Sequence, residues 1–264
     1  ELVRAGHTSS GGMVSILITA GPTREHLDDV RFLSNASSGR MGCALAEAAM
    51  AAGHQATLVL GPVELTPPVG VKVVSVTSAL QMQTAAEDVF ATCDVLIAAA
   101  AVSDWRPVSR EPGKPDRQPG NITVEFVPNP DIVAGLAATK NRAGRNRVVF
   151  GFALESVSAG LPAAIARGKR KIINKQLDAV VVNLHDTIGS EQAEFVLCHA
   201  TGLEQPLARC DKRRAADFIV AEAVDLWQQR NPGRSSSSSS SSGSSSSGSG
   251  SSSSAGSGSS GDSN

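Results

Sequence analysis

The stretch that decides the fold is Val14–Gly53, which reads VSILITAGPTREHLDDVRFLSNASSGRMGCALAEAAMAAG. It begins with a short β-branched apolar run, Val14–Thr19, and this pattern is typical of a buried strand. A polar loop follows, and Met41–Ala52 then repeats its apolar residues at helical spacing until Gly53 ends the pattern. A strand, a loop of small residues and a helix in this order predict the opening of an α/β domain.

Strand-like and helix-like segments alternate along the rest of the chain. Further strands are predicted at 56–60, 71–76, 95–101, 122–127, 148–152, 179–183 and 194–199, and further helices at 78–91, from 130 onward, at 161–175 and at 211–229. Thr77 or Ser78 is expected to cap the second helix, and Asn129 the third, with Pro130 in its first turn. This alternation predicts a Rossmann-like, doubly wound, mostly parallel α/β sheet.

Ligands of such sheets bind beyond the carboxyl ends of the strands. We therefore expect four loop segments, 21–39, 100–120, 129–131 and 152–155, to share one mouth. The segment 107–120 is rich in Pro, Gly and charged residues, and it is predicted to be a mobile loop.

Composition sets the limits of the domain. From about Ser235 onward the chain is almost entirely Ser and Gly, and its first twelve residues are polar and without periodicity. Such segments lack the apolar side chains that offset conformational entropy. The sequence thus predicts one domain over 13–230, with disordered segments at 1–12 and 231–264.

The charge balance excludes several classes of partner. The chain has 24 Lys and Arg against 25 Asp and Glu, so a general attraction to nucleic acid or to a membrane is not expected. No apolar run approaches the ~20 residues that span a bilayer. The four cysteines are scattered, without a C-x-x-C pair, which favours reduced thiols in a cytoplasmic protein.

The end of the first loop, Ser37-Ser38-Gly39, opens a helix and is a candidate anion site, because backbone N–H groups and the helix dipole favour phosphate there. The loop matches neither the P-loop nor a G-x-G-x-x-G pattern. A nicotinamide-dependent reductase is a rival interpretation, because the same strand–loop–helix opening also binds dinucleotides. Two features count against the reductase. The chain contains no Tyr, and Leu60-Gly61-Pro62 stands where an acidic ribose-binding residue would end the second strand.

Four segments, Thr19–Gly42, Ala98–Asp104, Asn129–Gly135 and Val149–Glu155, resemble the phosphopantothenate–cysteine ligase family, in order and with comparable spacings. The string ITAGPTRE…VRFLSNASSGRMG is far more specific than a glycine motif. In many bacteria this domain is fused to a flavin-dependent decarboxylase, and the sequence here matches the ligase domain alone, without a flavin site.

The resemblance implies a Rossmann-like ligase that joins 4'-phosphopantothenate to L-cysteine in coenzyme A biosynthesis. The substrate carboxylate would attack a nucleoside triphosphate, CTP more readily than ATP, to give an acyl nucleotide, and the cysteine amine would then displace the nucleoside monophosphate. Mg²⁺ and a homodimer are implied in the same way. A nucleotide-binding module without catalysis remains an alternative.

The resemblance also implies the site residues. The catalytic set is Asn35, Arg31 and Lys114, and the phosphate or substrate loop contains Gly21, Ser37, Ser38, Gly39 and Gly42. The nucleotide set is Ala98, Ala99, Ala100, Ala101, Asp104, Lys114, Pro130, Asp131, Ile132, Val133, Phe152, Lys171 and Lys175. No metal ligand is assigned.

Each assignment has a plainer structural interpretation. Asn35 is also typical of a turn, Arg31 of a surface ion pair and Asp104 of a loop cap, while Lys171 and Lys175 could be solvated charge on one helix face. The resemblance implies that Lys114 lies on a flexible flap over the active site. This flap departs from the family pattern of Lys-x-Lys-Lys, because Lys114-Pro115-Asp116-Arg117 stands in its place.

Overall fold

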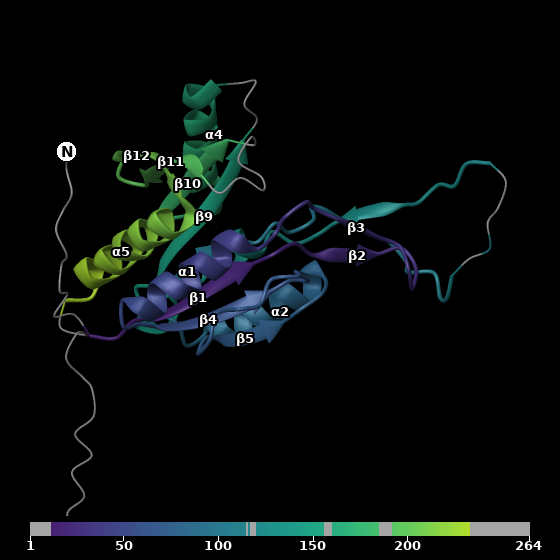
Figure 1. Ribbon diagram of the computed structural model, residues 1–264, viewed down its shortest axis with the longest axis horizontal. Coiled ribbons are helices and arrows are strands. Elements are labelled where there is room, and N and C mark those ends of the chain that lie inside the picture. The colour runs from purple at the N-terminus through teal and green to yellow at the C-terminus, as the bar shows by residue number, and fades with distance from the viewer. Residues whose placement is uncertain (1–11, 115, 117–119, 156–159, 185–191, 233–264) are drawn as a thin grey trace, which may run out of the picture.

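All but one of the strands that the sequence predicts lie in one central sheet (Figure 1). The computed structural model describes residues 12–114, 116, 120–155, 160–184 and 192–232. Within these residues the sheet has the strand order β12-β11-β10-β9-β6-β1-β4-β5. Its strands are β1 (Ser15–Ala20), β4 (Gln55–Leu60), β5 (Lys72–Ser75), β6 (Val95–Ala98), β9 (Val148–Glu155), β10 (Ala179–Leu184), β11 (Gln192–His199) and β12 (Glu204–Asp211).

The six strands from β5 to β10 are parallel, and β11 and β12 return antiparallel at one edge. The parallel part has the order of a doubly wound dinucleotide-binding sheet, with its switch point between β1 and β6. The predicted Rossmann-like, mostly parallel sheet is therefore confirmed. β12 was not predicted, because its alternating exposed residues lack an apolar run.

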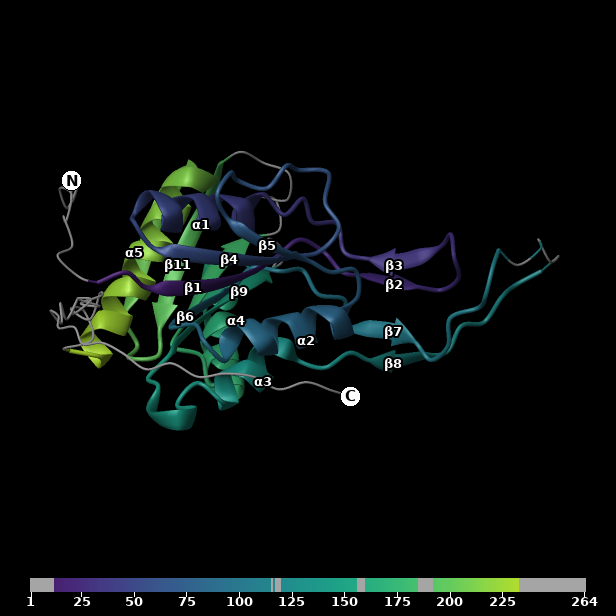
Figure 2. The same cartoon turned by 90° about the horizontal axis from the view of Figure 1, so that it is seen from below.

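Helices cover both faces of this sheet (Figure 2). α1 (Arg40–Ala51) and α5 (Lys212–Arg230) pack on one face, and α2 (Ala79–Phe90), α3 (Ile132–Ala138) and α4 (Gly160–Lys175) pack on the other. Ile16 and Ile18 of β1 join the first apolar core and Leu17 joins the second. Because both faces are buried, the central strand β6 is apolar at every position.

Helix boundaries follow the predicted signals with one correction. Ser78, one of the two predicted caps, begins α2, and it forms a capping box with Gln81. α3 is capped by Asp131 and not by Asn129, because the Asp131 carboxylate accepts a hydrogen bond from the N–H of Ala134. The Asn129 side chain instead donates to the carbonyl of Ser103. A short 3₁₀ turn, Arg142–Gly144, follows α3.

Two hairpins that the sequence did not predict extend side by side from the sheet (Figure 2). They are β2 (Arg24–His26) with β3 (Phe32–Ser34), and β7 (Trp105–Pro107) with β8 (Phe126–Pro128). The predicted strand at 122–127 was therefore largely wrong, since pairing begins only at Phe126. Each strand has three residues, which is too short to show an apolar period.

None of the helices in the described ranges combines the length and the apolar character that crossing a membrane requires. The predicted disordered ends, 1–12 and 231–264, lie almost entirely outside the described residues.

Candidate functional site

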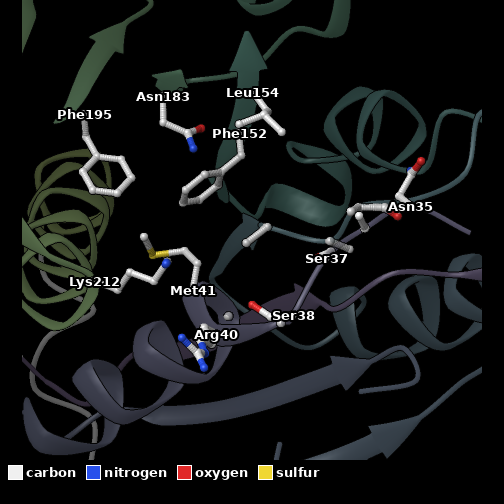
Figure 3. A pocket seen from close by; sticks show the side chains of 16 residues that line it. Asn35, Ser37, Ser38, Arg40, Met41, Phe152, Leu154, Asn183, Phe195 and Lys212 are labelled. Atoms are coloured by element: carbon white, nitrogen blue, oxygen red, sulfur yellow. Dashed lines mark hydrogen bonds between the residues drawn. The ribbon is translucent and has the colours of Figure 1, made fainter. Parts of the chain in front are cut away.

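A cavity of about 530 Å³ opens at the carboxyl end of the sheet, beside the switch point between β1 and β6 (Figure 3). It is lined by the loop and first turn of α1, the segment after β6, the ends of three strands and the start of α5. These residues are Asn35, Ala36, Ser37, Ser38, Gly39, Arg40, Met41, Gly42, Ala99, Ala100, Ala101, Phe152, Leu154, Asn183, Phe195 and Lys212. The cavity therefore lies where doubly wound sheets bind their ligands.

The first turn of α1 forms the cationic side of this cavity. Gly39 precedes the helix in the left-handed conformation, with φ of 74°, and no side chain among the described residues caps the helix. A Cβ on Gly42 would lie 2.1 Å from the Cβ of Ala20, so only glycine lets the helix begin this close to β1. Uncapped N–H groups attract anions, and the side chains of Arg40 and Lys212 line the same space.

Asn35 joins two loops at the other end of the cavity. Its amide nitrogen donates to the carbonyl oxygens of Ala101, at 3.2 Å, and Val102, at 2.9 Å. The N–H of Ser103 donates to the hydroxyl of Thr23, at 3.0 Å, and fastens the same two loops. The side chain is therefore held at the cavity edge with its amide oxygen outside these contacts.

The β9 strand directs its last side chains to opposite faces of the sheet. Phe152 and Leu154 line the cavity, whereas Ala153 belongs to the core on the other face, toward α4. Glu155 points to that second face as well, where it pairs with Arg167 and Lys171 of α4. Burial would raise the pKa of Glu155, but hydrogen bonds from Arg167 and Lys171 outweigh it and lower that pKa.

The structure brings part of the predicted set into the cavity. Asn35, Ser37, Ser38, Gly39, Gly42, Ala99, Ala100, Ala101 and Phe152 line it. The remaining predicted residues do not line it, and these are Gly21, Arg31, Ala98, Asp104, Lys114, Pro130, Asp131, Ile132, Val133, Lys171 and Lys175. One shared mouth is thus observed for the loops at 35–42 and 99–101 and for the end of β9.

Most of the predicted residues that do not line the cavity form two groups. Arg31 pairs with the buried Asp28 in the β2–β3 turn, and Lys114 follows Gly113, whose N–H donates to the Asp29 carboxylate at 2.9 Å. Lys114 therefore directly follows a residue that is bound to the β2–β3 turn. Pro115 and Arg117 of the predicted flap lie outside the described residues.

The second group lies on the α3 and α4 side of the sheet. Lys171 pairs with Glu155 at 3.0 Å, and Lys175 pairs with Asp131 at 2.9 Å. Asp131 is also the N-cap of α3, which places the predicted segment 130–133 at the start of that helix. Asp104 is exposed, and its carbonyl accepts from the N–H of Asn129 at 2.8 Å.

Sequence reasoning did not assign several residues of the cavity. Arg40 and Met41 directly follow the predicted loop in the sequence, so their place at the cavity could have been inferred from that position alone. Phe195 and Lys212 come from β11 and α5, and only the antiparallel return of β11 brings these distant segments across the mouth. In the described part of the chain, no cluster of three or more His, Cys, Asp or Glu side chains is arranged to hold a metal ion.

Comparison with known proteins agrees with this geometry. Residues 12–226 match the family described as the DNA/pantothenate metabolism flavoprotein C-terminal domain. The chain is 44% identical over 171 residues to the coenzyme A biosynthesis bifunctional protein CoaBC of Vibrio cholerae, covering 64% of this chain and 41% of that protein. It is equally similar to CoaBC of Escherichia coli K12. The chain thus spans about two fifths of the length of these curated relatives.

Solved structures show the same fold. The crystal structure of the C-terminal domain of CoaBC superposes with a TM-score of 0.70 at 30% identity, over 84% of this chain and 100% of that one. A Cab2 mutant (H337A) in complex with phosphopantothenate-cysteine superposes with a TM-score of 0.66 over 82% of this chain and 88% of that one; at 18% identity it supports the fold alone. The chain belongs to the family of the DNA/pantothenate metabolism flavoprotein C-terminal domain.

Proposed function

We propose that this protein is a ligase that condenses 4'-phosphopantothenate with L-cysteine through an acyl nucleotide, with CTP preferred over ATP. The observation that carries the proposal is the cavity at the switch point, which is lined by both the cationic start of α1 and Asn35. The relatives named for coenzyme A biosynthesis supply the substrate class.

The reaction joins groups that repel one another. The carboxylate of the first substrate attacks the α-phosphorus and expels pyrophosphate, and the cysteine amine then attacks the acyl carbonyl, loses its proton and expels the nucleoside monophosphate. Both partners of the first step are anions, so fixed N–H donors and cations must offset their charge. The N–H groups of α1, with Arg40 and Lys212, supply that charge at the cavity wall.

Asn35 has the chemistry to hold the acyl intermediate. Its amide is held at the cavity edge by the carbonyls of Ala101 and Val102. A neutral amide can bond to the acyl group without adding negative charge to an anionic site. Phe152 and Leu154 add an apolar wall, which would keep water from a hydrolysable anhydride.

The remaining predicted residues extend the nucleotide site beyond the cavity. We place the triphosphate over the carboxyl end of β9, toward Lys171, Lys175 and the 130–133 segment. Arg31 and Lys114 stay in the proposal as groups of the β2–β3 hairpin and the loop that starts beside it. Mg²⁺, when bound, would neutralise phosphate charge, and the exposed carboxylate of Asp104 offers the oxygen ligand that this ion prefers.

A homodimer is part of the proposal. The two projecting hairpins carry exposed apolar side chains, including Phe32, Leu33, Trp105 and Phe126. An exposed apolar patch on projecting strands is typical of a protein interface. The free cysteines, of which Cys93, Cys198 and Cys210 are buried, fit the reducing cytoplasm that we propose as its location.

The acyl nucleotide provides a direct test. Protein incubated with 4'-phosphopantothenate, CTP and Mg²⁺, without cysteine, should release pyrophosphate and accumulate phosphopantothenoyl-CMP, which mass spectrometry detects. Nucleotide binding without pyrophosphate release would favour the module without catalysis, and the altered Lys114–Arg117 sequence is the feature that would explain it.

A further inference from the structure

Helix α4 carries three cations along one side, Arg167, Lys171 and Lys175, which we name the basic stripe. They are four residues apart, so consecutive members lie ~6 Å apart along the helix axis and share a face. The adjacent face, with Ala164, Gly168 and Ile172, is buried. The basic stripe therefore borders the contact between α4 and the sheet.

The position of α4 is fixed closely by Gly168. A Cβ at this residue would lie 2.5 Å from a methyl carbon of Val182 and 3.2 Å from one of Val180. A side chain of any other type would push the helix away from β10. The basic stripe is thus held at a set depth beside the carboxyl end of β9.

Glu155, the last residue of β9, binds two members of the basic stripe at once. One carboxylate oxygen accepts from Nε of Arg167 at 2.5 Å, and the other accepts from the ammonium of Lys171 at 3.0 Å. The Glu155 side chain is 9% exposed, while those of Arg167 and Lys171 are 31% and 38% exposed. The carboxylate is therefore buried beneath two cations that reach solvent.

We propose that Glu155 is a positioning residue that directs Lys171 and Arg167 toward the nucleotide triphosphate, and that Arg167 is a further phosphate-binding residue. The inference rests on the proposed function, which already places Lys171 and Lys175 at the triphosphate. Neither Glu155 nor Arg167 is needed by the chemistry in the cavity on the other face of the sheet.

The donor count supports this role. An ammonium group has three N–H donors and a guanidinium has five. In the contacts found among the described residues, Glu155 uses one donor of Lys171 and Nε of Arg167, which leaves the outer N–H groups of both for phosphate oxygens. Fixing two long side chains in advance also reduces the conformational entropy that they lose when the nucleotide binds.

A purely structural ion pair is the competing explanation, and the chain contains a matched control for it. Asp178 is also buried, at 4% exposure, and also binds two cations, Lys140 and Arg230. It lies at the start of β10, at the opposite end of the sheet from the cavity. Asp178→Asn should therefore show how much stability is lost with a buried, paired carboxylate, without any effect on triphosphate binding.

The test is calorimetric binding of CTP, CDP and CMP to the full chain and its variants, each checked by circular dichroism for folding. Glu155→Gln should weaken CTP binding by at least about tenfold and CMP binding by less than about threefold. Arg167→Gln, which keeps the Glu155–Lys171 pair, should also weaken CTP binding more than CMP binding. Asp178→Asn should lower the unfolding temperature and leave the ratio of CTP to CMP affinity unchanged.

Three results would overturn the inference. Glu155→Gln could leave CTP affinity unchanged or tighten it, in which case the carboxylate does not position the cations for phosphate. It could also weaken the binding of CTP and CMP equally, which is the behaviour expected if the ion pairs of Glu155 serve only the stability of the fold. Wild-type protein that binds none of the three nucleotides would overturn the proposed function itself, whereas normal wild-type binding with an unaffected variant overturns this inference alone.

Discussion

At the scale of single residues, Asn35 connects the loop before α1 to the segment after β6 through two hydrogen bonds to carbonyl oxygens. Asn35→Asp replaces the two amide donors by a carboxylate, which repels those carbonyls and the anionic substrates. We expect kcat to fall by about 10–100-fold, because breaking these hydrogen bonds and placing a negative charge beside the two carbonyls costs about 1–3 kcal/mol. Pyrophosphate release measures this effect.

Nucleotide affinity provides the control for that substitution. The Asn35 side chain is at the cavity edge, away from the basic stripe, so CTP binding by calorimetry should change little. Unchanged turnover in the variant would show that Asn35 has no part in the chemistry.

The Cys93 thiol should make stability fall at alkaline pH. Burial raises its pKa from 9.0 to about 12, so above pH 9 the unfolded chain loses a proton that the folded chain keeps. The free energy of unfolding then decreases by about 1.36 kcal/mol per pH unit, or about 2 kcal/mol between pH 9 and 10.5. Urea unfolding at several pH values measures this decrease in the free energy of unfolding.

Cys93→Ala separates this thiol from other alkaline titrations. The variant should be less stable than wild type at pH 7, because a buried sulfur is lost, and the difference should shrink by about 2 kcal/mol by pH 10.5. A constant difference across that range would show that Cys93 ionises as easily in the folded protein as in the unfolded one.

Sequence reasoning located cavity residues that lie within one continuous stretch, Asn35, Ser37, Ser38, Gly39 and Gly42, from the loop that opens a helix and from the family resemblance. It could not locate Lys212 or Phe195, which reach the cavity only through the antiparallel pairing of β10 with β11. It also could not show that Lys171 and Lys175 have carboxylate partners, since Glu155 and Asp131 are distant in the chain.

At the scale of elements, the first turn of α1 depends on its close approach to β1. Gly42→Ala would place a Cβ 2.1 Å from that of Ala20, and relieving this contact should cost about 1–3 kcal/mol and move the N-terminal N–H groups of α1. We expect a lower free energy of unfolding in urea and weaker binding of CTP by the same protein.

Gly135 is the matched control, since it lies inside α3 and a Cβ there would meet no atom within 4 Å. Gly135→Ala should stabilise the protein by about 0.5–1 kcal/mol, because alanine has the higher helix propensity. If Gly42→Ala proved as stable as this control, the packing of α1 on β1 would not be the reason for glycine at 42.

The elements that the sequence predicted well have long apolar periods or distinct caps. β1, α1, β4 and α2 are examples, and the Ser78 capping box marks α2 directly. The two hairpins have no such signal. Their strands of three residues are stabilised by local contacts, such as the Asp28 carboxylate that accepts from the N–H groups of Val30 and Arg31, and the fold places them side by side.

At the scale of the whole molecule, the exposed apolar side chains of the two hairpins should be buried in a dimer. Trp105→Glu places a charge on that surface, where the side chain is 53% exposed. We expect the dimer dissociation constant to rise by at least about 30-fold, which corresponds to the loss of one interface hot spot. Sedimentation velocity measures it.

Val69 is the control for a new surface charge, since its side chain is 98% exposed and lies before β5, outside the hairpins. Val69→Glu should leave the association unchanged. A wild-type protein that sediments as a monomer at micromolar concentration would contradict the proposed dimer without affecting the ligase chemistry.

The measurement that tests the central claim most directly is turnover of the purified protein with 4'-phosphopantothenate, L-cysteine, Mg²⁺ and either CTP or ATP, in which pyrophosphate and nucleoside monophosphate are followed together. The account predicts CMP formation that requires both 4'-phosphopantothenate and cysteine, with pyrophosphate in equal amount and a slower reaction with ATP. Folded protein that binds nucleotide but forms neither product with CTP or ATP would contradict it.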